Sequence, residues 1–227
     1  MNRSLASLLA IAAAALPSAA AAHVAVQSGP AAAGKTRIVT FEVGHGCEGA
    51  DTASVRIEIP EAVGSVRAMP SPSASVEVER GADDRIVAVI WTRPDEVIAE
   101  NDTNAYLFSL RLGVPDAPFA TLYFPTIQTC KRGDGTTLST EWVARPGEEG
   151  EPAPGLTILP AGVPGWNRFT VPVALDSLAT WFADAEIVWR GNEAFSANPH
   201  TAAQIAATDG VGTLDSLAAG DQIWVKY

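Results

Sequence analysis

Apolar and polar residues alternate with a period of two along much of the chain, in short runs that Pro and Gly separate. This alternation is typical of β-strands with one buried face, and helical periodicity is nearly absent before Pro154. We therefore predict an all-β fold, an immunoglobulin-like antiparallel β-sandwich with a small mixed C-terminal extension. The predicted strands of the sandwich are KTRIVTFEV, ASVRIEIP, SVEVER, RIVAVIWT, AYLFSLRLGVP, FATLYFPTIQTC and LSTEWVA.

Two further segments complete the predicted organisation. The sandwich is expected over residues 23–145, followed at 146–160 by an acidic, Pro- and Gly-rich linker. Residues 161–227 form the extension, whose role the sequence does not indicate. It combines apolar strands with a short helix capped by Asn198. We expect the extension to pack on the sandwich, because so small a piece could hardly bury its tryptophans alone. These are Trp181, Trp189 and Trp224.

The N-terminal segment, residues 1–22, has the pattern of a secretory signal peptide: a basic Arg3, an apolar run and an A-x-A cleavage site. Its apolar run is shorter than the ~20 residues that span a membrane, and no later run is long enough. We expect a secreted or periplasmic protein without a transmembrane span, cleaved after Ala22. Cleavage makes His23 the first residue, whose imidazole and free α-amine can chelate one metal ion. The alternative is that cleavage falls beside a histidine by chance.

A first hairpin is expected between HVAVQ at residues 23–27 and TRIVTFEV at residues 36–43. In an antiparallel pair, the beginning of the first strand lies beside the end of the second. Strict alternation places Val24 on the core face. It also sets a glycine of the loop GHGCEG opposite His23, with His45 diagonal to it. A bulge at either of these glycines would redirect His45.

A second hairpin is expected from TIQTCKRGDGTTLSTEWV, turning about residues 133–135, with Cys130 roughly opposite Trp142. Cys130 and Cys47 are the two cysteines of the chain. In an exported protein such an isolated pair predicts a disulfide, which would tie this hairpin to the loop that carries His45. His23, His45 and Trp142 would then share one neighbourhood, the outline of a small metal site.

Several motifs together resemble the YcnI family of exported copper-binding domains, in the variety with an HGC loop and a cysteine pair. They are the signal that ends in His-Val, then FEVGHGCEG, IPEAV, PSP and FPTIQTC followed by TEW. The resemblance implies an immunoglobulin-like sandwich that binds Cu(II) through a single-histidine brace. The brace is the α-amine and ring nitrogen of His23, with Trp142 close to the metal. Other members carry an acidic residue in the loop, and here His45 or Glu48 is the candidate replacement. The usual Pro-Gly-Trp after PSP is absent.

The donor types suit this implied metal. Amine and imidazole nitrogens in a flat chelate favour Cu(II) over other common divalent ions. Trp142 has no lone pair to give, so it would shield an open coordination face or pack in the core. His45 could equally be a hydrogen-bonded loop residue, and His200 is expected to be a solvated residue near a helix terminus.

Composition and motifs narrow the function classes. The 26 acidic residues outnumber the 15 basic ones, so the basic patch that nucleic acid requires is missing. No phosphate-binding loop, Ser/His/Asp set or carboxylate pair stands out, and we expect no enzyme. The favoured function is copper sequestration, or transfer to another copper-handling protein of the cell envelope. The alternatives are a copper oxidase or oxygenase with a His23 and His45 brace, and a metal-free immunoglobulin-like binding module.

Overall fold

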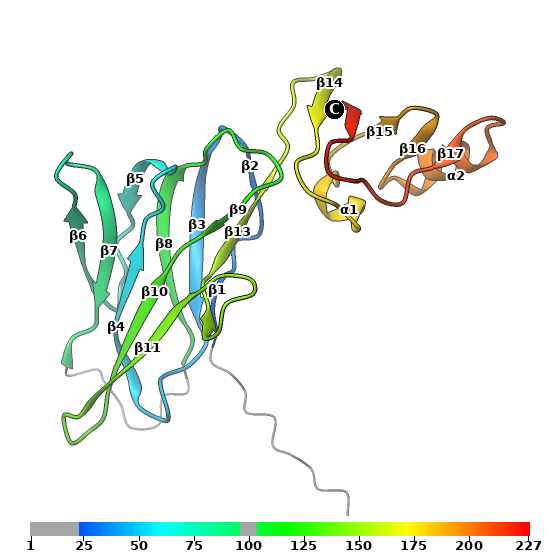
Figure 1. Ribbon diagram of the computed structural model, residues 1–227. Helices are drawn as coiled ribbons and strands as arrows, with labels where there is room; N and C mark the ends of the chain where they lie inside the picture. The colour runs from blue at the N-terminus through cyan, green and yellow to red at the C-terminus, as the bar shows by residue number, and fades with distance from the viewer. Residues whose placement is uncertain (1–22, 96–103) are drawn as a thin grey trace, which may run out of the picture.

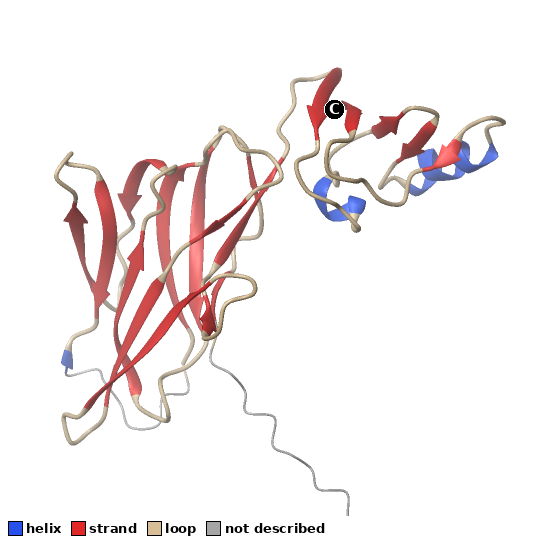
Figure 2. Cartoon of the chain, in the orientation of Figure 1, coloured by secondary structure: helices blue, strands red, loops and turns tan. Residues whose placement is uncertain are grey.

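A computed structural model describes residues 23–95 and 104–227, whose regular structure consists mainly of β-strands (Figures 1 and 2). The predicted signal peptide lies outside the described residues. One sheet of the sandwich has the order β1-β3-β8-β5 and the other the order β12-β11-β10-β4-β7-β6. The first comprises β1 (Val24–Val26), β3 (Thr36–Val43), β8 (Tyr106–Gly113) and β5 (Gly64–Ala68). The second comprises β12 (Glu151–Pro152), β11 (Thr137–Ala144), β10 (Thr126–Lys131), β4 (Asp51–Glu58), β7 (Ile86–Thr92) and β6 (Ser75–Arg80).

The core lies between these two sheets, which confirms the predicted sandwich. Strand β8 alternates buried and more exposed residues along its whole length, as its sequence predicts. Its Phe108 contacts Trp91 of β7 in the other sheet, with ring centroids 5.4 Å apart. Phe41 of β3 contacts Phe124 in the same way, at 5.2 Å. All four rings are fully or almost fully buried, so aromatic contacts join the sheets across the core.

The predicted linker at 146–160 is wrong over much of its length. Strand β13 (Gly155–Leu159) pairs with β9 (Thr121–Tyr123) and with β2 (Ala31–Ala32), and together they form a small third sheet. Leu156 and Ile158 of β13 are fully buried. The acidic, Pro- and Gly-rich stretch corresponds to the turns before β13 and to the two-residue strand β12. The apolar alternation that follows them belongs to the sandwich core.

Both predicted hairpins form, one in the expected register and one not. Val24 of β1 pairs with Val43 of β3, so the next position in this register sets Gly44, one of the two expected glycines, opposite His23. In the second hairpin, however, Trp142 lies opposite Thr126 rather than opposite Cys130, whose partner is Leu138. A turn at 133–135 fixes this register, because it brings together residues equally far from its centre. Cys130 is too close to the turn to reach Trp142.

The C-terminal extension has a five-stranded sheet of its own, ordered β14-β18-β15-β16-β17. Its strands are β14 (Trp166–Thr170), β18 (Gln222–Lys226), β15 (Ile187–Arg190), β16 (Glu193–Phe195) and β17 (Gly212–Thr213). Its helices are α1 (Leu178–Trp181) and α2 (Pro199–Ala207). Asn198 caps α2 as predicted, since its side chain accepts a hydrogen bond from the backbone N–H of His200 at 2.9 Å. His200 is exposed in the first turn.

Phe119 of the sandwich packs into the core of the extension. Its ring lies 5.8 to 6.1 Å from the rings of Phe169, Trp181 and Phe182. The hydroxyl of Tyr227 donates a hydrogen bond to the carbonyl of Pro160 at 3.1 Å. Of the three tryptophans expected to need burial, only Trp181 lies in this contact. The expectation is wrong for the other two, which lie on the outer face of the five-stranded sheet. Within the described residues, no helix is long and apolar enough to cross a membrane.

Candidate metal centre

His23 and Trp142 lie side by side at one end of the sandwich. Their ring centroids are 5.9 Å apart, with the planes tilted by 59°. His23 directly precedes β1 at the beginning of the first hairpin, and it is exposed. Trp142 is a residue of β11 in the other sheet, and only 2% of it is exposed. The structure therefore combines an accessible imidazole with a buried indole.

Gln128 of β10 holds Trp142 and the loop after β3 together. Its side-chain carbonyl accepts the indole N–H of Trp142 at 3.3 Å. Its amide nitrogen donates to the backbone carbonyl of His45 at 2.8 Å and to the hydroxyl of Thr52 at 3.0 Å. Gln128 is fully buried, and its side-chain oxygen and nitrogen both form hydrogen bonds, as is usual for buried polar groups. The sequence prediction did not single out this residue, although it lies within the QTC motif.

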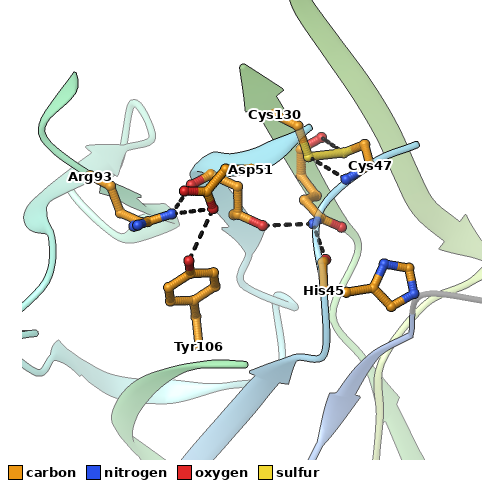
Figure 3. Close-up of polar contacts among 8 residues, drawn as sticks. His45, Cys47, Asp51, Arg93, Tyr106 and Cys130 are labelled. Carbon is orange, nitrogen blue, oxygen red and sulfur yellow. Dashed lines mark hydrogen bonds and ion pairs between the residues drawn. A yellow bond between two sulfur atoms is a disulfide. The ribbon is translucent and has the colours of Figure 1, made fainter. Parts of the chain in front are cut away.

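His45 lies on this loop and is half-buried. Its Nδ1 is 2.7 Å from the carbonyl of Gly46. A carbonyl only accepts, so Nδ1 carries the proton of the neutral ring and Nε2 carries the lone pair. In Figure 3 the imidazole points away from the neighbouring Tyr106. Nε2 is thus the atom of His45 that could bind a metal ion.

The loop of residues 44–50 has a conformation that glycine permits and a disulfide anchors. A Cβ atom at Gly46 would lie 1.8 Å from the carbonyl oxygen of Ala50, so only glycine fits there. The predicted disulfide between Cys47 and Cys130 is confirmed, with an S–S distance of 2.06 Å. The backbone N–H of Cys47 also lies 2.9 Å from the sulfur of Cys130. The loop is therefore fastened to β10 beside Gln128.

A buried ion pair lies behind the same loop (Figure 3). Arg93 donates to a carboxylate oxygen of Asp51 at 2.5 Å and to the carbonyl of Thr52 at 2.6 Å. The hydroxyl of Tyr106 donates to the same carboxylate oxygen at 3.0 Å, and the guanidinium lies 4.2 Å from the centre of its ring. These contacts offset part of the desolvation of the two charges. Sequence reasoning missed this cluster, because its members are far apart in the chain.

Glu48, the other candidate ligand in this loop, points elsewhere. Its carboxylate is mostly exposed and lies 3.7 Å from the guanidinium of Arg132 in the turn of the second hairpin. Its backbone φ is 46°, in the left-handed region. Among residues 23–95 and 104–227, no three His, Cys, Asp or Glu side chains gather as a metal-binding group.

The surroundings of His23 are compatible with the copper ion that the family resemblance implies. A brace takes two nitrogen donors from one residue, so it requires no cluster of three side chains. The imidazole of His23 is accessible, and the buried indole of Trp142 lies beside it. The oxygen ligand is not identified by these contacts.

Comparison with known proteins concerns mainly the sandwich. A family model described as a domain of unknown function, DUF1775, matches residues 23–158. An uncharacterized protein from Nocardia farcinica, whose crystal structure has an immunoglobulin-like fold, is 30% identical. The match covers 60% of this chain and 97% of that chain, with a TM-score of 0.49. A DUF4466 family protein from Parabacteroides merdae is 6% identical over 88% of this chain and 54% of that chain, with a TM-score of 0.22.

No curated protein matches the chain. The DUF1775 model covers more than half of the chain, and it ends within β13, the last strand of the sandwich. YcnI proteins, which the sequence motifs resemble, are known as DUF1775 domains. The chain belongs to the DUF1775 family.

Proposed function

We propose that this protein is exported, is processed to begin at His23, and binds one Cu(II) ion there. Its function would be to sequester copper or to pass it to another copper-handling protein of the envelope. The single observation that carries the proposal is the pairing of an exposed His23 with a buried Trp142, 5.9 Å between ring centroids. The disulfide supports export, because such bonds persist in oxidising compartments.

His23 would supply both nitrogen donors. Once its α-amine is free, amine and Nδ1 are close enough to close a chelate ring on one metal ion. Two nitrogen donors in a plane suit the tetragonal preference of Cu(II). The described residues offer no thiolate for Cu(I), since both cysteines are joined in the disulfide. The proposed site would therefore favour the oxidised ion.

Trp142 would act as a cover rather than a ligand. Its indole N–H is donated to Gln128, and the ring has no lone pair to offer. A large buried ring beside the chelate would exclude water and other ligands from one face of the ion. The HGC loop would limit access from another direction, with the oxygen position filled by water or by a partner protein.

A second candidate function rests on His45. Its Nε2 lone pair is not engaged by the hydrogen bond to Gly46, so it could become a third nitrogen ligand. Three nitrogen donors would make the two-histidine brace of a copper oxidase or oxygenase. Copper-dependent oxygen consumption with an added reductant would favour this alternative.

Titration of the processed protein with Cu(II), followed by electron paramagnetic resonance, tests the proposal. We expect one equivalent of copper and a spectrum with nitrogen couplings. His23→Ala should abolish this spectrum, whereas His45→Ala should alter it less. His200→Ala is the matched control, because His200 is an exposed histidine on α2. Unchanged binding in His23→Ala would refute the proposed site.

A further inference from the structure

Three tryptophans lie on the outer face of the five-stranded sheet in the C-terminal extension. Trp166 of β14 is 51% exposed and Trp224 of β18 is 50% exposed, while Trp189 of β15 is half-buried. Trp189 and Trp224 are direct partners across neighbouring strands. Trp166 lies on the other side of β18, opposite Lys226. The three indoles therefore occupy one continuous area of the sheet.

The fold of the extension does not require these rings. Its own core lies on the opposite face of the sheet, where Val188, Ile223 and Val225 are fully buried. Within the described part of the chain, none of the three indoles has a ring contact or an N–H hydrogen bond. The rings are thus spread over the sheet rather than stacked on one another. Exposed aromatic area of this extent marks a binding surface.

The surface is hollowed in two adjoining places with different chemistry. One hollow, of about 500 Å³, is lined by Gly191 and the three tryptophans. The second, of about 660 Å³, shares Trp166 and Trp189 with the first. It adds hydrogen-bonding groups to the shared indoles. Those groups are the side chains of Asp184, Glu186, Asn198, Thr201 and Lys226.

We infer that this surface, the tryptophan face, binds a carbohydrate chain. A β-linked pyranose with equatorial hydroxyls presents flat C–H faces that can lie on indole rings, and hydroxyls at its edge that both donate and accept. The tryptophan face offers spread rings in one hollow and carboxylate, amide and ammonium groups in the next. Several rings in a row suit an extended chain of sugar units better than a single small molecule.

The polar rim argues against two other occupants. A proline-rich peptide also docks on aromatic grooves, but it has few N–H groups to donate to the carboxylate of Asp184. A quaternary ammonium ion is held by rings that enclose it, whereas these rings are spread apart. Glu186 is in addition already paired with Lys226 at 2.5 Å. Hydroxyl groups are the partners that such a mixed rim can satisfy.

Calorimetric titration of the intact protein tests the inference, with cellohexaose and the hexamer of β-1,4-linked N-acetylglucosamine as probes. We expect at least one of them to bind and to quench tryptophan fluorescence. Trp224→Ala and Trp189→Ala should each weaken binding about tenfold, as expected for one lost stacked ring. Trp224→Phe should keep much of the affinity, because a flat ring remains.

Leu107→Ala is the matched control, since Leu107 is a similarly exposed apolar residue on the sandwich. It should bind the hexasaccharides normally, and circular dichroism should show that every variant is folded. Failure of both hexasaccharides to bind would overturn the inference. Binding of a proline-rich decapeptide or of choline through Trp224, without hexasaccharide binding, would also overturn it. So would a concentration-dependent dimer that Trp224→Ala abolishes.

Discussion

The imidazole of His23 lies beside the indole of Trp142 at one end of the sandwich, with ring centroids 5.9 Å apart and the planes tilted by 59°. Nearly the whole sandwich separates these residues in sequence. The first hairpin places His23 at the edge of one sheet, and the second places Trp142 in the other. Gln128 then holds the indole and the carbonyl of His45 with one buried amide. The environment of His23 is therefore fixed by residues that would not themselves bind metal.

Replacing Gln128 should loosen both elements that surround His23. Gln128→Met keeps much of the volume but removes the group that accepts the indole N–H of Trp142 and the group that donates to the backbone carbonyl of His45. A buried polar group without its partner costs about 1–3 kcal/mol, so the free energy of unfolding should fall by at least that much in urea. The copper spectrum should also broaden. Gln222→Met, on the exposed side of β18, is the control and should change neither quantity. Equal stabilities for the two variants would contradict this role for Gln128.

Removing the carboxylate of Asp51 should be far more harmful than removing a surface one. Asp51→Asn removes the carboxylate charge that the buried guanidinium of Arg93 contacts, and breaking a buried ion pair costs about 3–5 kcal/mol. Glu58→Gln breaks a partly exposed pair with Arg56 and should cost less than about 1 kcal/mol. Urea denaturation of the two variants measures the difference. If Asp51→Asn were as stable as Glu58→Gln, the buried ion pair would not contribute more to stability than the partly exposed one.

The phenol of Tyr227, which donates a hydrogen bond to the carbonyl of Pro160, should titrate at an unusually high pH. Burial, with a smaller effect of Asp184, raises the pKa of the Tyr227 phenol from 10.0 to about 12. The folded state thus favours the neutral phenol, so its contribution to stability is complete below about pH 10 and is lost as the pH rises toward 12. Absorbance of phenolate should therefore show that Tyr227→Phe removes one late-titrating tyrosine from the titration curve. A titration curve whose late part is unchanged in Tyr227→Phe would contradict the assignment.

Period-two alternation predicted the fold because most sandwich strands have one buried and one more exposed face. The same alternation placed Val24 on the core face and a glycine of the loop opposite His23, which agrees with the observed pairing of Val24 with Val43. It failed at Leu156 and Ile158, where a short buried strand follows a stretch of turn residues. Local composition cannot show that this segment pairs with β9 and β2, which are distant in the sequence.

The parts of the site that escaped prediction depend on contacts between distant residues. Nothing in the sequence near Asp51 or Arg93 indicates that they pair, and Gln128 has no neighbouring polar pattern that reveals three hydrogen bonds. Trp189 and Trp224 were expected to be buried because tryptophan usually is. Their direction depends on which face of the small sheet packs inward, and on β18 the apolar Ile223 and Val225 flank Trp224.

The central claim is that the α-amine of His23 binds copper, and one comparison tests it most directly. Two purified forms are titrated with Cu(II): one begins at His23, and the other carries a single extra alanine before it. In the longer form the same nitrogen belongs to a peptide bond and cannot serve as an amine ligand. We predict that the longer form binds far more weakly, with a different paramagnetic spectrum. Affinity of the shorter form should fall as the pH drops through about 7.7–8.0, where a free α-amine gains its proton. Equal affinities and identical spectra for the two forms would contradict the brace.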